Sequence, residues 1–249
     1  MSTKLKIAAA VAAAVLLSAC SSPKHEPMPL VNFTPSMEVT EVWSKGLSSA
    51  EGFLVPAVYD DMVFAAGGKT LTRLNARTGE TEWSVSFDSP ITGGVGSDGY
   101  VTAVGLWDGN LEVVDAEGKV SWEKKLTTEL ASPPVVSHGL VIARTMDTRV
   151  SAFEASSGEL QWTYQKSQPA LTVRLPTRML AHDNFLLVGQ PNGHIVILDI
   201  ASGKPVFEFQ VAQAKGVTEV ERLVDVVGAP AFSENLVCAA AFQGAVTCV

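Results

Sequence analysis

"LNARTGETEWSVSF", residues 74–87, places a turn glycine four positions before a tryptophan. The same arrangement returns in "VDAEGKVSWEKKL" from Val114 and in "FEASSGELQWTYQ" from Phe153. In "LDIASGKPVFEFQ" from Leu198, phenylalanine takes the aromatic position. The resulting pairs are Gly79 and Trp83, Gly118 and Trp122, Gly158 and Trp162, and Gly203 and Phe207. A fixed spacing in four places indicates a structural repeat.

The repeat has the length of one blade of a β-propeller. The tryptophans at 43, 83, 122 and 162 are separated by 40, 39 and 40 residues. Within one period, short apolar or alternating segments are separated by turn signals, and no amphipathic helix is evident after the N-terminal segment. The predicted turns are at His138-Gly139, Asp147-Thr148, Ser157-Gly158, Asp98-Gly99, Asp108-Gly109 and Asn192-Gly193. Four short antiparallel strands per period predict an all-β fold of propeller blades.

The glycine and the aromatic residue have structural roles in this interpretation. The glycine takes a positive φ in the turn between the third and fourth strands of a blade. The aromatic residue then lies on the outer strand, where a large indole covers the cleft between neighbouring blades. Burial at each such site contributes on the order of a few kcal/mol.

The sequence predicts about five blade units, which begin near Leu54, Ile91, Ser132, Arg178 and Gly228. The fifth ends at "AVTCV", where another turn glycine and tryptophan are expected, and "EVTEVWSKGL" resembles a fourth strand with no preceding three. We therefore expect residues 37–249 to be an incomplete propeller that ends within a blade. The segment around Trp43 would complete a last blade, and a closed ring would need about three further periods.

The N-terminus has the pattern of a secreted, anchored protein. Lys4 and Lys6 precede an apolar stretch at residues 7–17, which predicts a signal peptide over residues 1–19. The sequence "LSAC" ends at Cys20 and is similar to a bacterial lipobox, so we expect lipidation of Cys20; the alternative is an ordinary secretory signal with an incidental cysteine. Residues 20–36 carry several prolines and predict a flexible tether. Ser21, in place of the aspartate that retains lipoproteins in the inner membrane, favours the outer membrane.

The charge balance excludes one class of partner. The chain carries 18 basic and 26 acidic residues, a net charge of −8. Removal of Lys4 and Lys6 with the signal leaves 16 basic residues against the same 26. An acidic protein of this kind is unsuited to nucleic acid as its main partner.

Cys238 and Cys248 are the other cysteines, and a secreted protein can join such a pair. A two-residue turn at Gln243-Gly244 would place Cys238 opposite Val249 and Cys248 on the other face. On that register we expect two small buried hydrophobic residues rather than a disulfide.

Taken together, the lipobox, the tether and the blade repeat resemble the BamB family of β-propeller lipoproteins, and the resemblance extends over essentially the whole chain. It is most specific in two segments outside the repeat, "QPALTVRLPTRML" (residues 168–180) and "GVTEVERLVDVVGAP" (residues 216–230). The resemblance implies a ring of about eight four-stranded blades. It also implies no enzymatic activity, no cofactor, and a place on the periplasmic face of the outer membrane, where the family serves the β-barrel assembly (BAM) complex by binding the periplasmic domains of BamA. Other BAM subunits and unfolded barrel proteins are further expected partners.

The resemblance also assigns the residues that contact the partner. A loop with the pattern leucine, small polar, aliphatic, arginine maps to Leu171, Thr172, Val173 and Arg174. A second loop maps to Asp225, although Val227 replaces a second aspartate of the family pattern. The residues support this placement, because Leu171 and Val173 lie in a long interruption between blades, where a loop protrudes at the rim. The alternative is that both residues turn inward as a core strand.

The sequence gives weaker support for metal binding, for enzymatic activity and for other propeller functions. His25, His138, His182 and His194 are scattered without metal-ligand spacing, and no nucleophile motif is present. A quinone-dependent dehydrogenase is built on similar repeats, but such enzymes typically use adjacent cysteines, which this chain lacks. A polysaccharide-binding or cell-surface propeller is a third possibility, for which Trp107 is the one tryptophan outside the repeat positions.

The lipid anchor can be tested directly. We expect Cys20→Ala to abolish labelling by a radioactive fatty acid and to leave an unprocessed or soluble form, because no other residue offers the thiol to be acylated at the cleavage site. Labelling and fractionation of cells that express each variant measure this. A Cys20→Ala protein that is still labelled and bound to membranes contradicts the lipobox.

Overall fold

The computed structural model of the protein describes residues 29–48, 54–167, 169–233 and 236–249. The chain divides into two units, Met1–Thr40 and Glu41–Val249. The predicted signal peptide and Cys20 lie outside the described residues. Of the first unit, residues 29–40 form no strand or helix and are exposed. Within the described ranges, no helix is long and apolar enough to cross a membrane.

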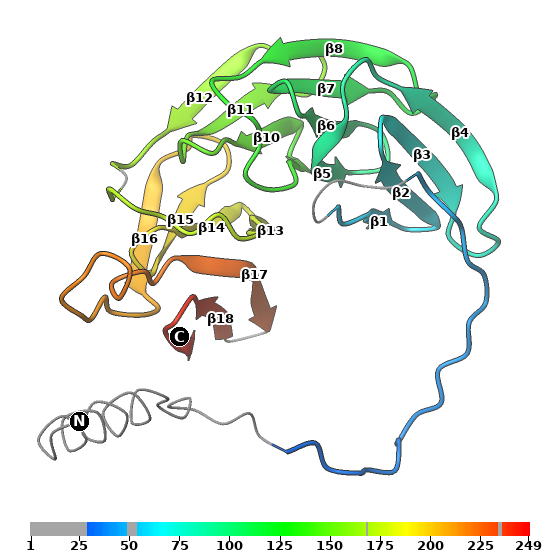
Figure 1. The fold of residues 1–249 in the computed structure, drawn as a ribbon. Coiled ribbons are helices and arrows are strands. Elements are labelled where there is room, and N and C mark those ends of the chain that lie inside the picture. The colour runs from blue at the N-terminus through cyan, green and yellow to red at the C-terminus, as the bar shows by residue number, and fades with distance from the viewer. Residues whose placement is uncertain (1–28, 49–53, 168, 234–235) are drawn as a thin grey trace, which may run out of the picture. The chain divides into compact units, whose positions relative to one another are not determined.

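The second unit consists of antiparallel sheets that succeed one another in chain order (Figure 1). Four sheets have four strands each, in sequential order, and the fifth has three within the described residues. The strands of the first two sheets are β1 (Ala57–Tyr59), β2 (Met62–Gly67), β3 (Thr70–Asn75), β4 (Thr81–Ser86), β5 (Ile91–Ser97), β6 (Thr102–Leu106), β7 (Asn110–Val114) and β8 (Val120–Lys125). Those of the other three are β9 (Val135–Ser137), β10 (Leu140–Arg144), β11 (Val150–Glu154), β12 (Leu160–Tyr164), β13 (Leu180–His182), β14 (Phe185–Gln190), β15 (His194–Asp199), β16 (Pro205–Gln210), β17 (Val226–Ser233), β18 (Leu236–Ala241) and β19 (Val246–Cys248).

These sheets confirm the predicted all-β blades, and we number them blades 1 to 5. Each first strand begins within three residues of the predicted start. Positive φ values occur at all six predicted turns, and they include non-glycine residues such as His138 (54°), Thr148 (63°) and Asn192 (71°). Hairpin turns of this kind match the twist of the flanking strands, which is why the short connections hold each blade in register.

The hydrophobic cores lie between blades, because each blade is one sheet thick. Alternate residues of a strand point to opposite faces. In β10, Leu140 and Ile142 therefore pack toward blade 4, and Val141 and Ala143 pack toward blade 2. The whole of β10 is buried as a result. The stacking of sheets thus explains why the middle strands read as continuous apolar runs.

The repeated tryptophan closes each blade against the next one. The indole N–H groups of Trp43, Trp83, Trp122 and Trp162 donate to backbone carbonyls of Ala76, Ala116, Ala155 and Ile200, at 2.8 to 2.9 Å. Each indole also lies flat against the turn glycine of that following blade, Gly79, Gly118, Gly158 or Gly203. A Cβ at any of these glycines would stand 2.4 to 2.8 Å from the ring. The glycine is therefore required both by its positive φ and by the tryptophan of the preceding blade.

Of the two repeat residues at the ends of the series, Trp43 and Phe207, only Trp43 makes this contact among the described residues. Trp43 lies in no assigned strand, yet it contacts Ala76 and Gly79 as the other tryptophans contact their turns. The segment around Trp43 thus lies beside blade 1 without forming a strand, and its predicted role as the fourth strand of a last blade stays a prediction. Phe207 occupies the repeat position on β16, where it pairs with Ile197 and is 56% exposed.

The fifth blade corrects the predicted cysteine register. Cys238 and Cys248 are directly paired across β18 and β19 and form a disulfide, with Cα atoms 4.1 Å apart. The expectation of two separate buried cysteines was wrong because the hairpin loop is one residue longer than a two-residue turn. Ala241 donates to the carbonyl of Ala245, and Gln243 takes a positive φ of 50° in the three-residue loop between them. One added residue moves every later side chain to the opposite face.

Candidate partner-binding surface

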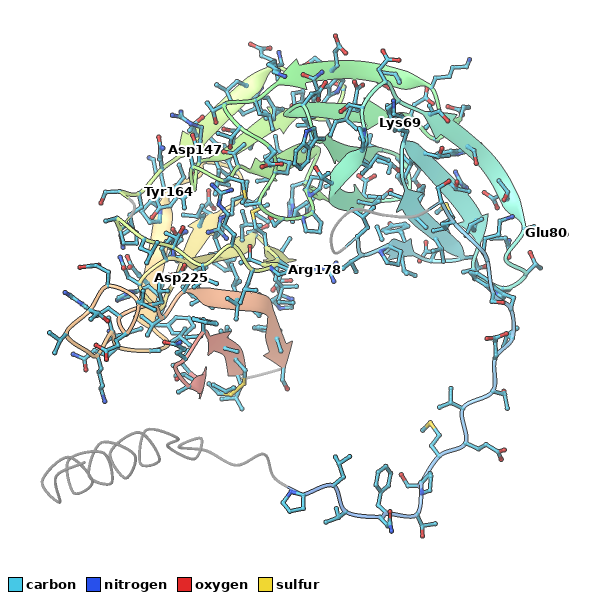
Figure 2. All side chains as sticks on the ribbon, viewed as in Figure 1. Lys69, Glu80, Asp147, Tyr164, Arg178 and Asp225 are labelled. Carbon is cyan, nitrogen blue, oxygen red and sulfur yellow. A yellow bond between two sulfur atoms is a disulfide. The ribbon has the colours of Figure 1, made fainter. Side chains whose placement is uncertain are left out.

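A loop interrupts the series of blades between β12 and β13. We call its described residues 169–177 the rim loop. Its C-terminal end is tied to blade 5 by an isolated parallel bridge between Thr177 and Gly228. Gly228 donates to the carbonyl of Pro176 at 2.8 Å, and Arg178 donates to the carbonyl of Gly228 at 3.0 Å. A connection between blades 3 and 4 is therefore held by blade 5, and Figure 2 shows Arg178 and Asp225 in this part of the molecule, beside β17.

Asp225 fixes the middle of the rim loop. Its carboxylate accepts a hydrogen bond from the backbone N–H of Val173, and its side chain is buried at 6% exposure. The two segments that the resemblance assigned to one partner surface are thus in contact with each other. The carboxylate of Asp225 faces inward and holds the loop backbone, and its direct contact with a partner stays a prediction.

The side chains of the rim loop are presented outward at its tip. Leu171 is 42% exposed and Leu175 is 40% exposed. Arg174 is exposed, and within the described ranges its guanidinium has no hydrogen bond or ion pair. Residues 169–176 belong to no strand, and Leu171 and Val173 belong to none of the hydrophobic clusters of the described residues. These observations favour the exposed loop over the inward core strand for Leu171, whereas Val173 is half-buried.

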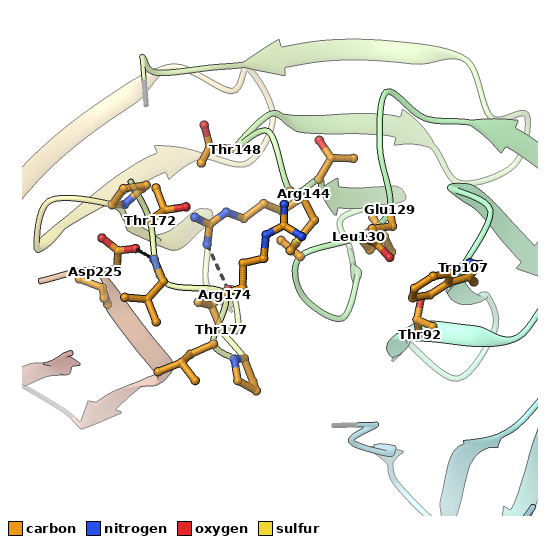
Figure 3. A pocket seen from close by; sticks show the side chains of 18 residues that line it. Thr92, Trp107, Glu129, Leu130, Arg144, Thr148, Thr172, Arg174, Thr177 and Asp225 are labelled. Carbon is orange, nitrogen blue, oxygen red and sulfur yellow. Dashed lines mark hydrogen bonds between the residues drawn. The ribbon is translucent and has the colours of Figure 1, made fainter. Parts of the chain in front are cut away.

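Behind the rim loop lies a cavity of about 550 Å³, shown in Figure 3. Blades 2 to 5 and the loop itself contribute to its walls. Residues that matter for its chemistry are Trp107, Glu129, Arg144, Thr148, Arg174 and Asp225. The sequence analysis missed Arg144, which ends the otherwise apolar strand β10. The signal in the sequence was an arginine directly after the apolar run of residues 140–143.

Arg144 is the most unusual ionisable group of this surface. Only 5% of the residue is exposed. Its Nη1 donates to Thr177 Oγ1 at 3.2 Å, and its Nε has no partner among the described residues. Burial lowers the pKa of Arg144 to about 10, and the negative charge of Asp225 opposes that shift. The guanidinium therefore keeps its charge near neutral pH despite its burial.

The described residues contain no cluster of His, Cys, Asp or Glu that could hold a metal ion.

A family model described as outer membrane protein assembly factor BamB matches residues 67–249. The chain belongs to the BamB family. This membership agrees with the resemblance seen in the two segments outside the repeat, and the match begins at the end of β2 and runs through blade 5.

Individual relatives agree with the family model. The outer membrane protein assembly factor BamB of Burkholderia pseudomallei is 39% identical over 96% of this chain. The match spans 65% of that BamB, so this chain covers slightly less than two thirds of it. The crystal structure of BamB from Moraxella catarrhalis is 28% identical with a TM-score of 0.71, over 78% of this chain and 60% of that one. A quinohemoprotein alcohol dehydrogenase of Pseudomonas putida HK5 has a TM-score of 0.58 at 16% identity, over 81% of this chain and 40% of that one, a likeness of fold alone.

The positioning role of Asp225 can be measured by amide hydrogen exchange. We expect Asp225→Ala to speed exchange at the amide of Val173 and to lower stability by about 1 to 3 kcal/mol, because a partly buried N–H loses its acceptor. Asp225→Asn is the matched control, since its amide oxygen can still accept that hydrogen bond. Equal protection of the Val173 amide in Asp225→Ala and in the parent protein contradicts this role.

Proposed function

We propose that this protein is a non-enzymatic scaffold in the assembly of β-barrel proteins into the outer membrane, and that the rim loop binds the periplasmic domains of BamA. The observation that carries the proposal is the rim loop itself. It presents an exposed leucine beside an arginine that has no partner in the described part of the chain, at the position where the family pattern occurs. Other BAM subunits and unfolded barrel proteins are further proposed partners.

The physical chemistry of the loop supports a protein partner. Leu171 and Leu175 gain by removal of their exposed apolar surface from water. An arginine that docks beside them supplies a directed, bidentate donor, and such residues are enriched at the centres of protein interfaces. The bonds from Asp225 and Gly228 hold the loop backbone before binding, which lowers the entropy lost when a partner docks.

The location of the protein is part of the same proposal. We place it on the periplasmic face of the outer membrane, held by lipid on Cys20 and spaced from the bilayer by residues 21–36. Several acyl chains at about 0.8 kcal/mol per buried methylene would make such an anchor nearly permanent. A tether of this length lets the blades reach a partner that is embedded in the same membrane.

The proposed interface predicts a specific loss of affinity. Arg174→Glu should weaken binding to the periplasmic domains of BamA by about 2 kcal/mol or more, because it reverses a charge at the contact. Binding would be measured by titration calorimetry with the full-length protein, together with the melting temperature of each variant. The loss should occur without a change in melting temperature, since Arg174 is exposed, lies outside the strands and forms no ion pair among the described residues.

Three variants make the comparison decisive. Arg77→Glu is the charge-matched control, because Arg77 lies in a turn of blade 1 and its ion pair with Asp61 is exposed, so that its loss costs little stability. It should leave affinity unchanged. Asp225→Ala should weaken binding less than Arg174→Glu does, and Trp122→Ala should lower the melting temperature and affect binding only indirectly. Full affinity in a natively stable Arg174→Glu protein would remove the rim loop from the interface.

A further inference from the structure

Arg144 is a buried cation with an N–H donor that lacks an acceptor among the described residues. A guanidinium carries several N–H donors that require acceptors when it leaves water. In the described structure Arg144 makes one side-chain hydrogen bond, to Thr177, and its buried Nε has no acceptor. A charge in this state is costly, and buried charges in proteins are normally paired. The residue thus has capacity for a ligand that the protein itself does not fill.

The two carboxylates that line the cavity with Arg144, those of Asp225 and Glu129, do not fill this capacity. Asp225 accepts the backbone N–H of Val173, and it makes no ion pair with Arg144 within 4.0 Å. Glu129 lines the same cavity, and Figure 3 draws it toward Trp107 rather than toward Asp225. Both acids therefore leave Arg144 without a bidentate partner among the described residues.

The cavity offers a second cation and room for a side chain. Arg174 of the rim loop lines the same space of about 550 Å³ as Arg144. Thr148 and Thr172 add hydroxyl groups to the wall. Two guanidinium groups on one cavity match the two oxygens of a carboxylate, which arginine binds in a planar, bidentate manner.

We propose that this cavity binds the carboxylate of an aspartate or glutamate side chain from the protein partner that docks on the rim loop, with Arg144 deep in the cavity and Arg174 at its mouth. The inference rests on the proposed function and adds the chemistry that the partner must present. The apolar wall residues Leu175 and Pro176, with Trp107, suit the stem of a protein side chain better than a free anion. A net charge of −8 on the chain also disfavours a polyanion as the occupant.

A double-mutant cycle with the partner tests the proposal. Each exposed aspartate and glutamate of the periplasmic domains of BamA would be replaced by its amide, and its affinity measured for the parent protein and for Arg144→Met. One amide substitution should weaken binding to the parent protein by about 30-fold or more, as expected for a desolvated charge pair. The same substitution should have almost no effect against Arg144→Met, because the two changes remove one contact.

Two further variants test whether the loss of affinity is specific to the guanidinium of Arg144. Arg144→Lys should recover only part of the affinity, since lysine supplies a point charge without the planar fork. Arg77→Met is the matched control, because it removes an exposed arginine from blade 1, and it should bind as the parent protein does. If Arg144→Met unfolds, the Nε–Hε NMR signal of Arg144 in the parent protein decides: a shift at saturating BamA domains supports the proposal, and an unchanged signal overturns it.

The outcomes separate the two proposals. Parental affinity in Arg144→Met, combined with a loss in Arg174→Glu, overturns the carboxylate site and leaves the rim loop as the interface. Parental affinity in both variants overturns both. A loss in Arg144→Met that is coupled to no acidic residue of the partner also overturns the carboxylate site, because the arginine would then act through the fold.

Discussion

The flat contact between a tryptophan of one blade and the turn glycine of the next is the constraint on which the rest of the second unit depends. A single sheet cannot bury both of its faces, so each blade is stable only against its neighbours. The indole covers the outer end of that join and donates to a backbone carbonyl of the same turn, as Trp162 does to Ile200. The contact therefore fixes the spacing of neighbouring blades at the outer strand, while the apolar clusters fix it in the middle strands.

The candidate site depends on this order of blades. Arg144 comes from blade 3, the rim loop leaves blade 3 and enters blade 4, and Asp225 and Gly228 belong to the start of blade 5. The three segments that supply these groups, around Arg144, the rim loop and residues 225–228, lie far apart in sequence. A shift between blades would separate the carboxylate of Asp225 from the N–H of Val173 and change the cavity beside it. The scaffold thus sets the shape of the surface that a partner meets.

The repeat made much of the fold predictable from the sequence. Glycine and tryptophan spacing reports local geometry, so the turns, the strand pattern and the blade boundaries could be read without knowledge of distant contacts. The identity of each contact could not be read in this way. The tryptophan of one blade meets the glycine of the following blade, as Trp122 meets Gly158, and that pairing follows only from stacking.

The candidate site was predictable in part. Leu171 and Arg174 were assigned from the resemblance to the family, and their place in an interruption of the repeat predicted the exposed loop in which they lie. The inward role of Asp225 and the burial of Arg144 depend on segments that approach through folding, and no local pattern encodes them. The disulfide was missed for a smaller reason, because a hairpin loop longer by one residue at Gln243 reversed the expected facing of Cys248.

The central claim is that the turn glycine is needed to receive the tryptophan, and two glycines with nearly equal backbone angles test it. Gly158 has φ of 71° and a Cβ there would stand 2.8 Å from Trp122, whereas Gly139 has φ of 72° and open space. The measurement is the free energy of unfolding of Gly158→Ala and Gly139→Ala, each in the parent protein and with Trp122→Ala. Both substitutions strain the backbone by about 1 kcal/mol or more, and Gly158→Ala should cost about 2 kcal/mol beyond that. The account predicts that this excess disappears when Trp122 is alanine; equal costs for the two glycines in the parent protein would contradict it.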